Sequence, residues 1–72
     1  METYHIVYFD QHQESVVGDF NSVREAAGKY LEAWMQRRDY ICWYKNSDKS
    51  YTAVVCTPQG EDTDATCVVV CN

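Results

Sequence analysis

The sequence predicts an α+β fold in two layers, with one helix packed on a mostly antiparallel sheet. Apolar residues recur in steps of three and four between Val23 and Met35, which is the period of a helix buried on one side. The segments on both sides of that stretch are rich in valine, threonine and aromatic residues, which favour strands. The expected order is ββαβββ, and the chain of 72 residues, 46% of them hydrophobic, is expected to form a single domain, residues 1–72.

Two strands are expected before the helix. Thr3–Phe9 is rich in β-branched and aromatic residues, and Ser15–Phe20 has a similar character. The polar segment Asp10–Glu14 between them has the length of a hairpin connection. Gly18, inside the second strand, predicts a bulge or a close contact with the helix.

The helix is predicted to run from Val23 to Arg38. Ser22 and Glu25 have the spacing of a capping box, in which the serine hydroxyl accepts the amide hydrogen of the glutamate. Arg37 and Arg38 are placed in the last turn, where the helix dipole favours cations. The stripe that faces the sheet consists of Val23, Ala26, Ala27, Tyr30, Leu31, Trp34 and Met35.

Tyr40–Lys45 and Ser50–Thr57 are expected to form a hairpin across Asn46–Lys49. A loop of two or of four residues there gives the same register, because both are centred on the same point of the chain. That register sets Tyr44 opposite Tyr51, Trp43 opposite Thr52 and Cys42 opposite Ala53.

The last strand is expected at Thr66–Cys71, after a polar, acidic loop at Pro58–Ala65. The run from Cys67 to Cys71 is apolar throughout. Such a run predicts a strand that is buried on both faces and lies in the centre of the sheet.

The net charge of −5 limits the partners that can be expected. Residues 1–20 and 50–72 contain acids and no lysine or arginine, and all six bases fall in residues 21–49. Nucleic-acid binders need clustered bases to neutralise phosphates, so no direct contact with nucleic acid is expected. A protein partner with a basic surface is expected instead, because opposite charges steer the encounter.

No targeting or membrane segment is predicted. Residues 1–9 contain an acid and no base, unlike the start of a signal peptide. The uncharged run Ala65–Asn72 is too short to span a bilayer. We therefore expect a soluble, cytoplasmic protein that does not bind membranes; if a phage encodes it, the compartment is the host cytoplasm.

No catalytic, metal or cofactor site is predicted, and the chain is not expected to be an enzyme. The cysteines, Cys42, Cys56, Cys67 and Cys71, fall in apolar strands, which disfavour a reactive thiolate. Cys67 and Cys71 lie about 13 Å apart along one strand, too far for a disulfide. Four reduced, buried thiols are the simplest interpretation. A zinc site built from Cys42, Cys56, Cys67 and a histidine is an alternative.

Tyrosines and acids are the candidate binding residues. If the helix covers Trp43, Val7 and Phe9, five tyrosines line the bare side of the sheet, where they would suit an interface: Tyr4, Tyr8, Tyr40, Tyr44 and Tyr51. Glu61, Asp62 and Asp64 in the acidic loop would contact a basic partner. The alternatives are that several tyrosines complete the core and that the acidic loop is only solvated.

In length, negative charge and lack of an active-site motif, the chain resembles the small acidic inhibitors that phages and mobile elements use against host defences, including anti-CRISPR proteins. The resemblance rests on size and composition and assigns no residue. It implies a stoichiometric inhibitor that covers the basic, nucleic-acid-binding surface of a host defence complex. The alternatives are a structural or assembly module that forms a homodimer through its sheet, and a small zinc-binding domain.

Overall fold

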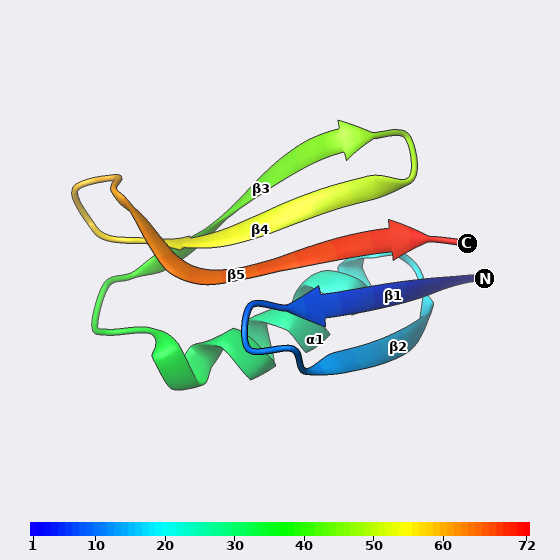
Figure 1. Ribbon diagram of the computed structural model, residues 1–72, viewed down its shortest axis with the longest axis horizontal. Coiled ribbons are helices and arrows are strands. Elements are labelled where there is room, and N and C mark those ends of the chain that lie inside the picture. Colours follow the sequence, from blue (N-terminus) through cyan, green and yellow to red (C-terminus); the bar gives the residue numbers. More distant parts are fainter.

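Five strands form one antiparallel sheet in the order β2-β1-β5-β4-β3, and one helix packs against it (Figure 1). The computed structural model describes residues 1–72. The elements follow the predicted order: β1 (Glu2–Tyr8), β2 (Gln13–Gly18), α1 (Phe20–Leu31), the 3-10 turn η1 (Glu32–Trp34), β3 (Tyr40–Ser47), β4 (Ser50–Cys56) and β5 (Asp62–Cys71). The predicted α+β class is confirmed.

Strand β5 lies at the centre of the sheet, between β1 and β4, as predicted. It begins at Asp62, four residues earlier than expected, so part of the predicted acidic loop belongs to the strand. The prediction that β5 is buried on both faces is wrong. Val69 is fully buried, whereas its neighbours Val68 and Val70 are 42% and 44% exposed, because only one side of the strand faces the helix.

The helix begins three residues earlier than predicted because Asp19, rather than Ser22, is its N-cap. The Asp19 carboxylate accepts a hydrogen bond from the backbone amide of Ser22 over 3.0 Å, and the Ser22 hydroxyl donates to the same oxygen over 3.1 Å. Gly18 precedes the cap with φ of +151°, and a Cβ there would lie 2.8 Å from the Ser22 hydroxyl oxygen. A glycine therefore allows β2 to turn directly into the helix.

The helix also ends earlier than predicted, at Leu31, and continues only as the short turn η1. The Asp39 carboxylate accepts the backbone amide hydrogen of Gln36 over 2.8 Å, and Arg38 has φ of 75°, in the left-handed region. This local turn reverses the chain toward β3. Arg37 and Arg38 consequently lie outside the helix, and the prediction that they occupy its last turn is wrong.

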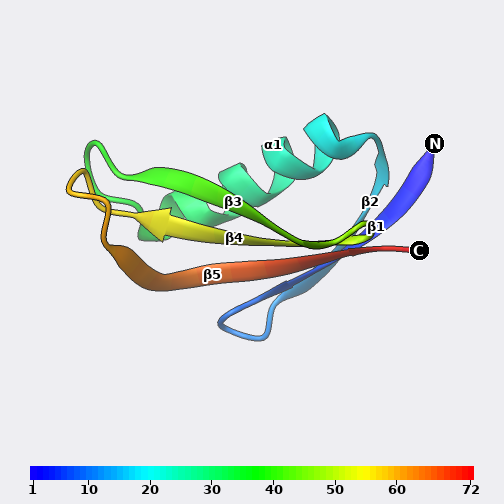
Figure 2. The ribbon, with the colours of Figure 1, turned by 90° about the horizontal axis from the view of Figure 1, so that it is seen from above.

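The core lies between the helix and one face of the sheet. The helix contributes Val23, Ala27 and Leu31, all with 0% exposure, so the centre of the predicted stripe is confirmed. The sheet contributes alternate residues of its central strands: Tyr4, Ile6, Tyr8, Ala53, Val55, Ala65, Cys67, Val69 and Cys71. Figure 2 shows the helix on one side of the sheet and no element on the other.

The register of the β3–β4 hairpin differs by one residue from the prediction. Ser47 pairs with Ser50 around a tight turn at residues 48–49, but Lys45 pairs with Tyr51, so Asn46 is an extra residue in β3. The Asn46 amide donates to the hydroxyl oxygens of Ser50 and Thr52 over 3.3 and 2.7 Å, which stabilises this bulge. The observed pairs are Tyr44 with Thr52, Trp43 with Ala53 and Cys42 with Val54.

A shift of one residue reverses the side on which every residue of β4 lies relative to β3. Tyr51, Ala53 and Val55 therefore face the helix together with Ile41 and Trp43.

Neither α1 nor η1 has the length and apolar character needed to cross a membrane.

Val69 and Val70 provide a matched test of which side is covered. Val69→Ala should lower the free energy of unfolding by about 2 kcal/mol, because it leaves a cavity beneath the helix. Val70→Ala should lower it by at most about 0.5 kcal/mol, because the side chain already meets solvent. Urea denaturation of both variants measures the difference; equal losses would contradict the described packing.

The Asp19 cap predicts a particular loss of stability in acid. Its hydrogen bonds with Ser22 hold the pKa of the Asp19 carboxyl below its ordinary 3.8, so the ionised cap stabilises the fold above that pH. This contribution is lost as the pH falls through the lowered pKa. Asp19→Asn keeps an acceptor at the cap but removes the charge. The stability advantage of the wild type over this variant should be present at neutral pH and absent in strong acid, measured by urea denaturation at each pH.

Candidate functional site

The uncovered side of the sheet, called the open face below, is the most extensive candidate site. Strand pairing places on it Thr3, His5 and Val7 of β1, Ser15 and Val17 of β2, Thr66, Val68 and Val70 of β5, Thr52 and Val54 of β4, and Tyr40, Cys42 and Tyr44 of β3. None of these residues is lysine, arginine, aspartate or glutamate. The centre of the open face is therefore uncharged.

Several apolar side chains of the open face are about half-exposed. The exposed fractions are 45% for Val7, 64% for Val17, 42% for Val68, 44% for Val70, 44% for Tyr40 and 48% for Tyr44. These side chains come from β2, β1, β5 and β3; on β4, which lies between β5 and β3, the open-face residue Val54 is 8% exposed. An apolar surface of this extent is typical of a site that contacts another macromolecule.

Three of the five predicted interface tyrosines lie on the other side. Tyr4 and Tyr8 are 7% and 2% exposed beneath the helix, and Tyr51 packs against Phe20 with ring centroids 4.5 Å apart. Burial of Tyr4 and Tyr8 is tolerated because each hydroxyl reaches a carboxylate at the rim: Tyr4 donates to Glu2 over 3.0 Å and Tyr8 to Glu14 over 3.2 Å. These three tyrosines complete the core, which is the alternative that the sequence left open.

The prediction of which side the helix covers is also wrong for β1. Val7 was expected beneath the helix but lies on the open face, opposite Gln13 and Val68. Phe9 follows the end of β1 and packs edge-on against Trp34, with ring centroids 5.0 Å apart, at the rim of the molecule. The helix packs on the side of β1 that carries Tyr4, Ile6 and Tyr8. The two tyrosine rings bury more apolar surface in the core than the Val7 side chain would.

The predicted acidic residues lie at one end of the open face. Asp62 and Asp64 begin β5, Glu61 lies in the turn before it, and all three are exposed. Alternation along β5 puts Asp62 and Asp64 on the same side as Val68. The negative charge of Asp62 is the main cause that raises the pKa of the Tyr44 hydroxyl, so this acidic end borders the tyrosines.

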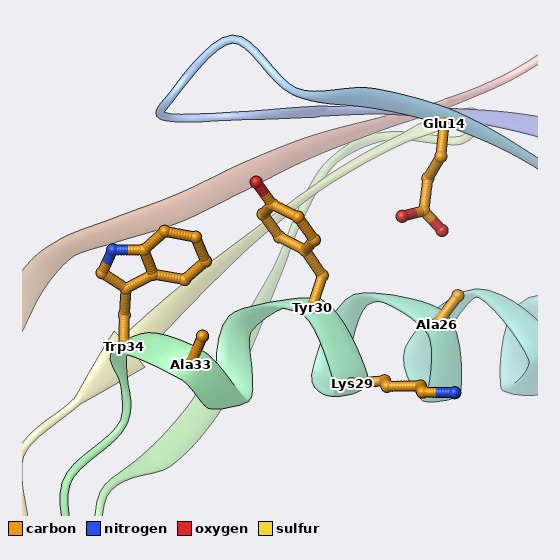
Figure 3. Close-up of a pocket in the computed structure, with 6 residues that line it drawn as sticks. All are labelled: Glu14, Ala26, Lys29, Tyr30, Ala33 and Trp34. Carbon is orange, nitrogen blue, oxygen red and sulfur yellow. The ribbon is translucent and has the colours of Figure 1, made fainter.

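A second candidate is a groove of about 500 Å³ between the helix and β2 (Figure 3). Tyr30 and Trp34 point from the helix layer toward the β1–β2 hairpin, and Glu14 points from β2 toward the helix. Ala26, Lys29 and Ala33 complete the lining.

The polar groups beside the groove are engaged with one another. The Tyr30 hydroxyl donates to Asp10, and the His12 ring stacks on Tyr30 with centroids 4.3 Å apart. Nε2 of His12 lies 3.6 Å from the Glu14 carboxylate, which also accepts the Tyr8 hydroxyl. These contacts close the β1–β2 hairpin onto the helix, which gives the groove a structural role.

The cysteines and histidines do not form a metal centre. No group of three histidine, cysteine, aspartate or glutamate side chains is placed to hold a metal ion, so the alternative zinc site at Cys42, Cys56 and Cys67 is not formed. His5 is hydrogen-bonded to Ser15 and Asn72 rather than to a cysteine. All four cysteines are free, and Cys67 and Cys71 are buried in the core.

Sequence reasoning missed two features. The groove brings Tyr30 and Trp34 together with Glu14 of β2, and in the sequence only the spacing of four residues between the two aromatic residues pointed to a shared surface. The sulfur atoms of Cys42 and Cys56 are 3.1 Å apart, although the predicted register put the two residues on opposite sides of the sheet. The bulge at Asn46 accounts for the second omission.

No family model, no curated protein and no solved structure matches this chain.

Hydroxyl-radical footprinting with mass spectrometry should distinguish the two groups of tyrosines. Tyr40 and Tyr44 should be oxidised several-fold faster than Tyr4 and Tyr8, because oxidation follows side-chain exposure and the second pair is below 10% exposed. Unfolding the protein in urea should abolish the difference, which controls for intrinsic reactivity. Equal protection of all four tyrosines in the native protein would mean that the open face is covered.

Proposed function

We propose that this protein is a non-catalytic binding protein that docks its open face onto a partner protein with a basic surface and thereby blocks that surface. The observation that carries the proposal is the broad set of half-exposed apolar side chains, represented by Val68, Val70, Tyr40 and Tyr44, on a sheet face that no element covers.

The dimensions of the open face suit a protein partner. Strands spaced about 4.8 Å apart and about seven residues long, at about 3.3 Å per residue, give a five-stranded sheet a flat area of roughly 550 Å². Side-chain relief increases the accessible area above this value. A typical specific interface buries about 800 Å² on each partner, so the open face and its rim supply most of what one requires.

The charge distribution favours a basic partner. Residues 19–39, which hold the cap, the helix and the following turn, contain four acids and four bases and carry no net charge. The strands and their hairpin turns contain seven acids and two bases, so the whole net charge of −5 belongs to the sheet layer. A partner that approaches this layer meets a negative field around an apolar centre, which steers basic surfaces toward it.

The same distribution argues against a second copy as the occupant. Two sheet layers brought face to face would place like charges along both rims, including Asp62 and Asp64, and this repulsion opposes docking. We therefore favour a partner that presents apolar side chains ringed by lysine and arginine. Proteins that handle nucleic acid carry such basic surfaces, and covering one would inhibit them stoichiometrically. This agrees with the resemblance to small acidic anti-defence inhibitors.

Two variants with the same charge change test the docking surface. Val68→Lys adds a cation to the centre of the open face, and Ala33→Lys adds one beside the groove on the helix side. The probes are purified nuclease and surveillance complexes with basic nucleic-acid sites, titrated calorimetrically in low and high salt. A complex bound by the wild type should bind Val68→Lys at least about 100-fold more weakly, because an unpaired lysine would be desolvated in the interface.

The Ala33→Lys variant should bind within about threefold of the wild type, and high salt and nucleic acid should each weaken binding. An affinity for the partner that either Val68→Lys or high salt leaves unchanged would overturn the proposal. Light scattering at tens of micromolar protein measures the oligomeric state and tests the competing occupant. A wild-type dimer that Val68→Lys converts to a monomer would mean that a second copy occupies the open face.

A further inference from the structure

Cys42 and Cys56 lie side by side on the open face, at the edge of the sheet. Cys42 pairs with Val54 and Cys56 with Tyr40, so the two cysteines are diagonal neighbours on the same side of β3 and β4. Their sulfur atoms are 3.1 Å apart, about 1 Å longer than a disulfide bond of about 2.05 Å. The register between β4 and β5 shifts between Val54 and Cys56, and such irregularities increase local twist.

The two thiols differ in access. Cys42 is half-buried, whereas Cys56 is 1% exposed and lies within 3.4 Å of the Asp62 carboxylate. The hydrogen bond to Cys42, together with burial, raises the pKa of Cys56 to about 12. Cys56 therefore remains protonated while Cys42 is free, and a reagent from solvent meets Cys42 first.

The other two cysteines lack this arrangement. Cys67 and Cys71 face the helix, are 1% and 9% exposed, and are separated along one strand by about 13 Å. Burial raises the pKa of Cys67 to about 11. The chain thus contains one pair of thiols in contact, of which Cys42 is half-buried and Cys56 is buried, and two buried thiols that contact no other cysteine.

We propose that Cys42 and Cys56 form a thiol–disulfide exchange site that reacts with small-molecule disulfides of the glutathione class and ends as an intramolecular disulfide. The proposal goes beyond the proposed function, because it concerns the chain alone and requires no partner.

The reaction proceeds in two exchanges. The Cys42 thiolate attacks one sulfur of glutathione disulfide; a bond forms to Cys42, the glutathione disulfide bond breaks, and one glutathione thiolate leaves with the electron pair. Cys56 then loses its proton to Asp62 or water and attacks the Cys42 sulfur, which expels the second glutathione thiolate. Two protein thiols are oxidised, one glutathione disulfide is reduced, and the two thiol protons end on the two glutathione molecules.

The geometry assists the second exchange. Capping Cys42 as a mixed disulfide removes the thiol that contributes most to the raised pKa of Cys56. The Asp62 carboxylate, already within 3.4 Å of the Cys56 sulfur, can receive the proton. The resulting bond would tie the edge strand β3 to β4 between the exposed rings of Tyr40 and Tyr44, and would therefore fix the tyrosine end of the open face.

The test uses the folded 72-residue chain in buffers of defined glutathione and glutathione disulfide, quenched with an alkylating agent and analysed by intact mass and peptide mapping. The wild type should lose two hydrogens, gain no glutathione, and yield one cross-linked peptide pair containing Cys42 and Cys56. Cys67 and Cys71 should be alkylated only after unfolding. A reducing agent should restore all four thiols.

Three variants assign the roles. Cys56→Ser should stop at one glutathione on Cys42, Cys42→Ser should react at least tenfold more slowly, and Cys67→Ser, the matched core control, should oxidise like the wild type.

A wild-type chain that keeps four free thiols, a cross-link that includes Cys67 or Cys71, or oxidation of Cys56→Ser without retained glutathione would overturn the proposal. Because the wild-type map decides the pairing, a variant that fails to fold does not remove the test. Partner binding plays no part in it, so its failure is distinct from failure of the proposed function.

Discussion

The structure depends on one constraint: a single helix of 12 residues can cover only one face of a five-stranded sheet. Val23, Ala27 and Leu31 pack on the sheet around the central strand β5, and this contact buries the residues that hold the fold together. No other element covers the opposite side of the strands, where Val68 and Val70 are 42% and 44% exposed. The open face is therefore a direct consequence of how the core is built.

One bulged residue decides what the open face contains. Asn46 is accommodated in β3 without a partner in β4, held by its bonds to Ser50 and Thr52, and this sets the register of the whole hairpin. The same shift sends Tyr51 into the core and brings Cys42 and Cys56 into contact. A shift of one residue, stabilised by a few local hydrogen bonds, therefore determines both which side chains lie on the open face and the contact between Cys42 and Cys56.

Charge and apolar surface are separated in this fold. The helix layer is neutral, the sheet layer carries the net negative charge, and the centre of the open face carries none. Tyr40 and Tyr44 lie next to the acidic start of β5, so aromatic rings and carboxylates lie close together on this part of the surface. A partner with an apolar patch among lysines and arginines would satisfy both parts of this surface.

The sequence by itself determined the α+β class, the order of elements and the buried centre of the helical stripe, because these follow from local period and composition. The apolar run of β5 also indicated its central position, although one face of that strand is exposed. Only the tertiary structure decided the helix cap at Asp19, the side taken by Tyr4 and Tyr8, and the contact between Cys42 and Cys56. Alternation along a strand defines two sides but does not say which one a helix will cover. That choice depends on packing and on a register set by one unpaired residue, both of which join parts of the chain that are distant in sequence.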